Sequence, residues 1–124
     1  MEIGVHINNI FIRLHANEAL IHYGFQSKEE KNFKINKFIF KNNDILGCGL
    51  VYPPTILSEK LPYVFFTQNG KQIGKAVLLN QTNGIYEPYI ALKCCSVETN
   101  FGNDLNSNPF NYSISKHFLA EEFF

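Results

Sequence analysis

The sequence predicts an all-β protein folded as a sandwich or a barrel. Short apolar or alternating runs recur along its 124 residues, turn-forming clusters separate them, and no long stretch has the helical period. A hairpin is indicated at Asn69-Gly70, because both residues tolerate the positive φ that a two-residue type I′ turn requires. The composition agrees, since 45% hydrophobic and 18% charged residues are typical of a globular domain. One domain is the natural count for this length.

The first half of the chain contains five candidate strands, and Asn8-Asn9 divides the first two. In the fifth, the glycines of Gly47-Cys48-Gly49 allow a neighbouring backbone or large side chain to approach closely. Cys48 between them is interpreted as a small buried residue. The polar stretch from Gln26 to Asn32 is expected to be a loop. In chain order, the expected strands are Ile3 to Ile7, Ile10 to Leu14, Leu20 to Phe25, Phe33 to Phe40 and Asp44 to Tyr52.

The second half contains the hairpin and three more candidate strands. The aromatic and β-branched run that begins at Tyr63 precedes the Asn-Gly turn, and Ile73, Val77 and Leu78 follow it. Pro53-Pro54 ends the preceding strand. Three connections are expected, at Thr55 to Pro62, Asn80 to Gly84 and Gly102 to Pro109, and three strands, at Tyr89 to Leu92, Ser96 to Phe101 and Phe110 to Ile114.

The charge balance argues against a nucleic acid partner, and the lack of a long apolar run argues against a membrane span. Eleven basic and eleven acidic residues give a formal net charge of zero, and the lysines between Lys28 and Lys37 are mixed with Glu29 and Glu30. No apolar run approaches the roughly 18 residues that span a bilayer. The N-terminus shows no basic segment followed by an apolar block, so no signal peptide is indicated.

The residues capable of catalysis or metal binding form no recognisable pattern. His6, His15, His22 and His117 show no metal-ligand spacing with one another or with the cysteines. Carboxylates such as Asp44 lack an evident partner for acid–base chemistry. We therefore expect no enzyme, no metal and no cofactor.

The three cysteines indicate a reducing compartment. Three is an odd number, and Cys94 and Cys95 are adjacent, so they would bridge only through a strained ring. Free thiols are typical of the cytoplasm and the nucleus. We expect the chain to act in the cytoplasm, and in the nucleus as the other reducing compartment.

Several segments, in order, resemble the SPRY domain, the common core of the B30.2 family. The segments are Ile3-Gly-Val5, Ile21-His-Tyr-Gly24, Asn43-Asp-Ile-Leu-Gly-Cys-Gly-Leu50, Phe65-Phe-Thr-Gln-Asn-Gly-Lys-Gln-Ile-Gly74, Tyr86-Glu-Pro88 to Leu92, Val97-Glu-Thr-Asn-Phe-Gly102 and Asn108-Pro-Phe-Asn-Tyr-Ser-Ile114. The closing segments are most similar to SPRY domains of the Ran-binding-protein-in-microtubule-organising-centre type. Each motif is weak alone, and their order and spacing carry the resemblance.

The resemblance implies a two-sheet antiparallel β-sandwich, a concanavalin A-like jelly roll, that spans residues 1–115. SPRY domains usually show one or two strands before the Ile-Gly-Val motif, and here Met1 stands almost at its glycine, so we expect an N-terminally truncated domain lacking its first strand. The missing strand would leave an unpaired sheet edge that is available for association. The apolar segment 116–124 is expected to pack on the domain near that edge.

The resemblance also implies a protein-recognition module that binds a peptide or a protein surface through loops at one rim, as adaptors in ubiquitin-ligase or signalling assemblies do. Loops on a rigid sandwich commonly carry recognition residues. By position, the candidate partner-binding residues are Tyr52, Tyr63, Tyr86, Lys93 and Cys94. A lectin-like sugar-binding sandwich is the alternative, although the chain has no Trp for sugar stacking.

Overall fold

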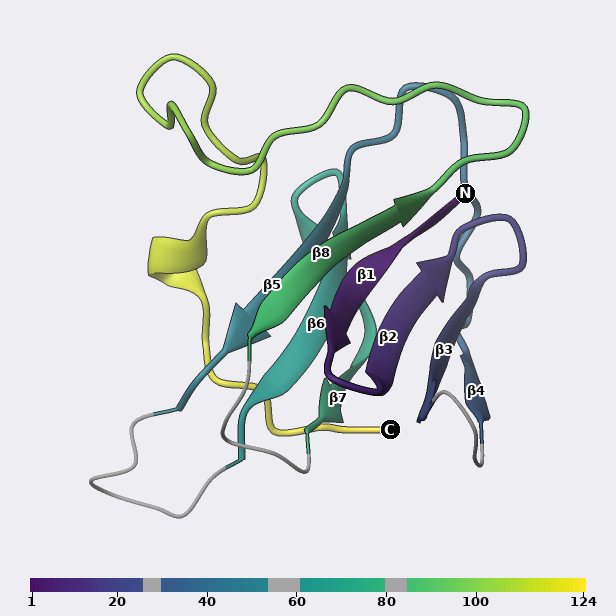
Figure 1. Ribbon diagram of the computed structural model, residues 1–124. Coiled ribbons are helices and arrows are strands. Elements are labelled where there is room, and N and C mark those ends of the chain that lie inside the picture. Colours follow the sequence, from purple (N-terminus) through teal and green to yellow (C-terminus); the bar gives the residue numbers. More distant parts are fainter. Residues whose placement is uncertain (26–29, 54–60, 80–84) are drawn as a thin grey trace.

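The computed structural model describes residues 1–25, 30–53, 61–79 and 85–124, and the predicted all-β fold is confirmed. Two antiparallel sheets face each other, one of five strands in the order β4-β3-β2-β1-β8 and one of three in the order β5-β6-β7 (Figure 1). The strands are β1 (Glu2–Ile7), β2 (Ile10–His15), β3 (Leu20–Phe25), β4 (Lys31–Lys34), β5 (Leu46–Val51), β6 (Tyr63–Gln68), β7 (Lys71–Leu78) and β8 (Tyr86–Ala91). Within these described ranges, no helix is long and apolar enough to cross a membrane.

The core lies between the two sheets. Alternate side chains of β1, β2 and β3 point toward the three-stranded sheet, and Ile12, Leu14 and Ile21 have no solvent exposure. Val64 and Phe66 of β6 meet them from the other side. Burial of these aliphatic and aromatic side chains, at about 25 cal/mol per Å² of apolar surface, holds the layers together.

The Asn69-Gly70 turn has the predicted geometry. Both residues have positive φ, at 50° and 83°, as a type I′ turn requires. Asp44 fixes the turn to the start of β5, because its carboxylate accepts hydrogen bonds from Asn69 Nδ2 at 2.9 Å and Gln68 Nε2 at 2.8 Å. The hydrogen bond from Asn69, followed by the one from the Lys41 backbone amide, lowers the pKa of Asp44.

The C-terminal segment covers the outer face of the three-stranded sheet. Phe123 forms an isolated parallel bridge with Ala76 of β7, and Phe124 donates its amide to the Ala76 carbonyl at 3.0 Å. The Tyr63 hydroxyl lies 2.7 Å from Nε2 of His117, whose ring stacks on Phe65 at 4.7 Å. The segment therefore forms a third layer on β6 and β7, and its last residues lie beside β7 (Figure 1).

Three predicted strands are wrong in position or in kind. Ser96 to Phe101 and Phe110 to Ile114 are not strands, and the only regular structure there is a 3-10 turn at Ile114–Lys116. These two segments have no neighbouring strand to pair with, so their alternating pattern produces no hydrogen-bonded ladder. The strand expected at Phe33 to Phe40 is instead β4, which ends at Lys34.

Other expectations fall partly outside the described residues. These are the connections at Thr55 to Pro62 and Asn80 to Gly84 and most of the loop expected from Gln26 to Asn32, whose last residues belong to β4. Tyr52, Tyr63 and Tyr86 next to these connections are described.

Deletion of residues 116–124 is expected to destabilise the domain. It uncovers Tyr63 and Phe65, each 1% exposed, and removes the His117 contacts. Exposing two aromatic side chains costs about 2–4 kcal/mol of unfolding free energy, which lowers the melting temperature by about 10 °C in a domain of this size. Calorimetry measures the change. Phe118→Ser is the matched control, since Phe118 belongs to the same segment but is 90% exposed, and an unchanged melting temperature after deletion would contradict the third-layer role.

Candidate functional site

Two of the predicted partner-binding residues meet at one end of the sandwich. Tyr52 follows β5 and Tyr86 begins β8, and their rings pack edge to face with centroids 6.2 Å apart. Tyr52 is 54% exposed, whereas Tyr86 is half-buried and its hydroxyl is buried beside the Tyr52 phenol. Burial, and then the neighbouring Tyr52 phenol, raise the pKa of Tyr86 to about 12. A surface aromatic pair with one exposed ring is a typical kind of anchor for a protein ligand.

The other three predicted residues lie elsewhere. Lys93 and Cys94 are exposed but follow the opposite end of β8 from Tyr86. Five residues of extended strand separate the two ends by roughly 17 Å. Tyr63 is 1% exposed, because its position on β6 faces the C-terminal segment, and its hydroxyl also accepts the Ala120 amide at 3.0 Å. A side chain so enclosed cannot touch a partner, so Tyr63 belongs to the scaffold.

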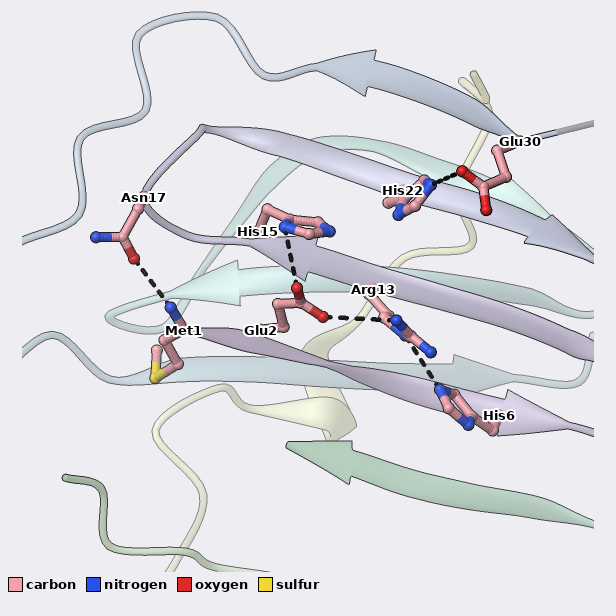
Figure 2. Close-up of polar contacts among 8 residues, drawn as sticks. All are labelled: Met1, Glu2, His6, Arg13, His15, Asn17, His22 and Glu30. Atoms are coloured by element: carbon pink, nitrogen blue, oxygen red, sulfur yellow. Dashed lines mark hydrogen bonds and ion pairs between the residues drawn. The ribbon is translucent and has the colours of Figure 1, made fainter. Parts of the chain in front are cut away.

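Sequence reasoning missed a polar and aromatic cluster on the outer face of the five-stranded sheet (Figure 2). Arg13 of β2 reaches across β1 to β8, where its guanidinium carbon lies 4.2 Å from the Tyr89 ring centroid. Gly4 is the residue of β1 that it crosses, opposite both Arg13 and Tyr89, and a Cβ there would stand 1.9 Å from the Ile12 carbonyl oxygen. His6 stacks on Tyr89 at 4.4 Å. The cluster thus ties three strands together by cation–π and stacking contacts.

Carboxylates balance the basic groups of this cluster. Glu2 lies 3.6 Å from Nη1 of Arg13 and 3.3 Å from Nδ1 of His15, and Glu30 lies 3.0 Å from Nε2 of His22. Arg13 Nε donates to His6 Nε2 at 3.1 Å, which places the His6 proton on Nδ1. Among the described residues, no group of three His, Cys, Asp or Glu side chains is arranged to hold a metal ion.

A signal for this cluster exists in the sequence. Its histidines and arginine occupy alternate positions of three consecutive predicted strands, which places them on one face once the strands pair in register. Spacing along the chain, which is the usual sign of a metal site, does not reveal a grouping made across strands. Its arginine and carboxylates pair with one another across strands, so the cluster braces the sheet.

Comparison with known proteins gives a partial similarity. The chain is 35% identical over 91 residues to the probable ATP-dependent RNA helicase ddx1 of Dictyostelium discoideum, and the match covers 73% of this chain. It covers 10% of that protein, so the chain spans about a tenth of the length of the curated relative that it matches. No protein-family model matches. No solved structure matches either.

The pH dependence of stability is expected to contain a contribution from His6. Burial, and then the Arg13 charge, lower the pKa of His6 from 6.5, while Glu87 opposes them. The unfolded chain therefore binds this proton more readily, so the contribution to stability is present above pH 6.5 and is lost as the pH falls through the folded-state pKa. An NMR titration should place the His6 midpoint below 6.5. Arg13→Gln should raise that midpoint part of the way back, and an unchanged midpoint in the variant would refute the Arg13 effect.

Proposed function

We propose that this chain is a SPRY-like protein-recognition domain, without catalytic activity, that binds a peptide or protein surface. The observation that carries the proposal is the aromatic pair of exposed Tyr52 and half-buried Tyr86 at one end of a two-sheet scaffold. Aromatic anchors bury a large area and lose little rotamer entropy, which makes them frequent hot spots. The expected setting is the cytoplasm or the nucleus, which suits three exposed free thiols.

The positions of the SPRY-like motifs support the proposal. Gly47-Cys48-Gly49 lies in the middle of β5, the Asn-Gly turn joins β6 to β7, and Tyr86-Glu-Pro88 opens β8. The three motifs thus lie at three successive places in the fold, in the order in which they carry the resemblance to SPRY domains. An adaptor role in a ubiquitin-ligase or signalling assembly is the context that the resemblance implies. The helicase activity named for the Dictyostelium protein belongs to a chain of which the match covers 10%, and it is not carried over.

Peptide-library selection tests the proposal. A displayed library of random peptides is panned against the full chain, and the affinity of the selected peptides is measured by fluorescence anisotropy. Tyr52→Ala and Tyr86→Ala should each weaken binding by about tenfold, which corresponds to a hot-spot contribution of about 1.4 kcal/mol. Ile39→Ser is the control, because Ile39 is 68% exposed and is not part of the pair. Selection of no peptide, together with saturable binding on a glycan array, would favour the lectin-like alternative.

A further inference from the structure

Three of the four sheet edges are protected against strand pairing. β4 carries Lys31 and Lys34, and the edge of β7 is paired with the C-terminal residues at Ala76. The edge of β8 contains Pro88, which has no N–H. Charged side chains, proline and covering segments are the usual ways in which proteins prevent edge association.

Pro88 acts on the free side of β8. The Ala16 amide donates to the Met1 carbonyl at 3.0 Å, so the odd residues of β1 direct their backbone groups toward β2 and the even residues direct theirs toward β8. Pro88 is opposite the odd residue Val5, so its backbone position faces outward. The missing donor therefore lies on the exposed edge, where it impedes pairing.

The remaining edge, that of β5, has no such protection. The Asn69 amide donates to the Ile45 carbonyl at 2.7 Å, which fixes the alternation: odd residues of β5 bond to β6, and Leu46, Cys48 and Leu50 direct both backbone groups outward. None of these outward groups has a partner among the residues that the structure describes. No charged residue and no proline occurs from Ile45 to Tyr52.

Apolar side chains lie uncovered next to this edge. β5 contacts β1 across the space between the sheets, and β8 lies one strand beyond β1. Tyr52, which follows β5, packs on Tyr86 at the start of β8. Tyr86, Pro88 and Ile90 are opposite the inward residues of β1 and therefore point to the core side. Ile90 is nevertheless 36% exposed and Pro88 is exposed. One added strand beside β5 would cover these side chains.

Cys48 marks the centre of the β5 edge. The prediction that it is buried is wrong, because its side chain is exposed. Cys48 is therefore accessible to a segment that lies along the edge.

We infer that the β5 edge, consisting of the outward backbone groups of Leu46, Cys48 and Leu50, binds an extended segment of a partner protein as an added strand above Tyr86, Pro88 and Ile90. The inference rests on the proposed protein-recognition function and specifies the form of the ligand. The strand would gain backbone hydrogen bonds from β5 and place alternate apolar side chains on β8. The β5 edge has no charged residue from Ile45 to Tyr52, which favours an apolar segment.

A second copy of this chain fits the site poorly. In each copy, β8 projects one strand beyond the β5 edge. Symmetric pairing of two β5 edges would therefore place β8 of the second copy where β1 of the first copy lies. A single strand without an attached second layer meets no such obstacle. We therefore assign the edge to an extended segment.

Amide hydrogen exchange measured by NMR on the full chain tests the assignment. The probes are an octapeptide of alternating valine and threonine between terminal lysines, and the tightest peptide from the library. In the free protein, the amides of Leu46, Cys48 and Leu50 should exchange rapidly and those of Gly47 and Gly49 slowly. Saturating peptide should slow the first group by at least about tenfold, as backbone pairing requires. The octapeptide with alternate N-methylated residues is the control and should have no effect.

Charge variants provide a second measurement. Cys48→Lys places a charge on the core-side face of the edge, and it should weaken peptide binding by about tenfold or more. Ile45→Lys adds the same charge just before the strand on the outer face, where Ile45 is 54% exposed, and should leave the affinity within about twofold.

Four outcomes would overturn the inference. Protection of the three outward amides in the free chain would show that residues of the chain itself cover the edge, and protection that grows with protein concentration would show a second copy. Library peptides that bind through Tyr52 and Tyr86 without slowing these amides would leave the proposed function standing and remove the added strand. Absence of protection with either peptide would likewise remove the added strand and leave the proposed function standing.

Discussion

The structure depends on a strand that is buried on both faces. In β6, every residue from Tyr63 to Thr67 is buried, with Val64 and Phe66 against the five-stranded sheet and Tyr63 and Phe65 on the opposite side. An antiparallel sheet commonly leaves one face in water, and then its strands alternate between apolar and polar residues. β6 does not alternate, so its sheet requires a cover on each side. The C-terminal segment is that second cover.

The second cover is held by polar contacts as well as apolar ones. The Tyr63 hydroxyl is buried and needs partners, and His117 and the Ala120 amide supply them. Tyr112 bonds to the other ring nitrogen of the same histidine. Since neutral imidazole has one donor and one acceptor, one tyrosine donates to His117 and the other accepts from it. This chain of bonds fixes the direction of a segment that has almost no regular structure.

The sequence predicts those elements whose pattern is local. β3 begins and ends where the alternation from Leu20 to Phe25 does, and the positive φ of Asn69 and Gly70 follows from the chemistry of those two residues. The segment Ser96 to Phe101 shows the limit of this reasoning. Its pattern is compatible with a strand, but a strand also requires a neighbour, and local sequence does not indicate whether one is in reach.

The candidate site was predictable in part for the same reason. Position beside a connection singles out Tyr52 and Tyr86, and their rings pack against each other. The same reasoning singles out Tyr63, but Tyr63 belongs to the strand that is buried on both faces. Its burial becomes evident only from where residues 116–124 pack. The Arg13 cluster depends on register across three strands and is visible only after pairing.

The alternation within β5 separates the scaffold from the proposed binding surface. The backbone groups of its odd residues bond to β6. A Cβ on Gly47 would stand 2.4 Å from Oγ1 of the opposite Thr67, and one on Gly49 would stand 2.3 Å from the ring of the opposite Phe65. These glycines are therefore needed for packing of the scaffold. The even positions carry no such constraint from β6, and their backbone groups face outward. A substitution at Cys48 can thus alter binding while β6 stays in place, whereas one at Gly49 cannot, because it must displace a buried phenylalanine.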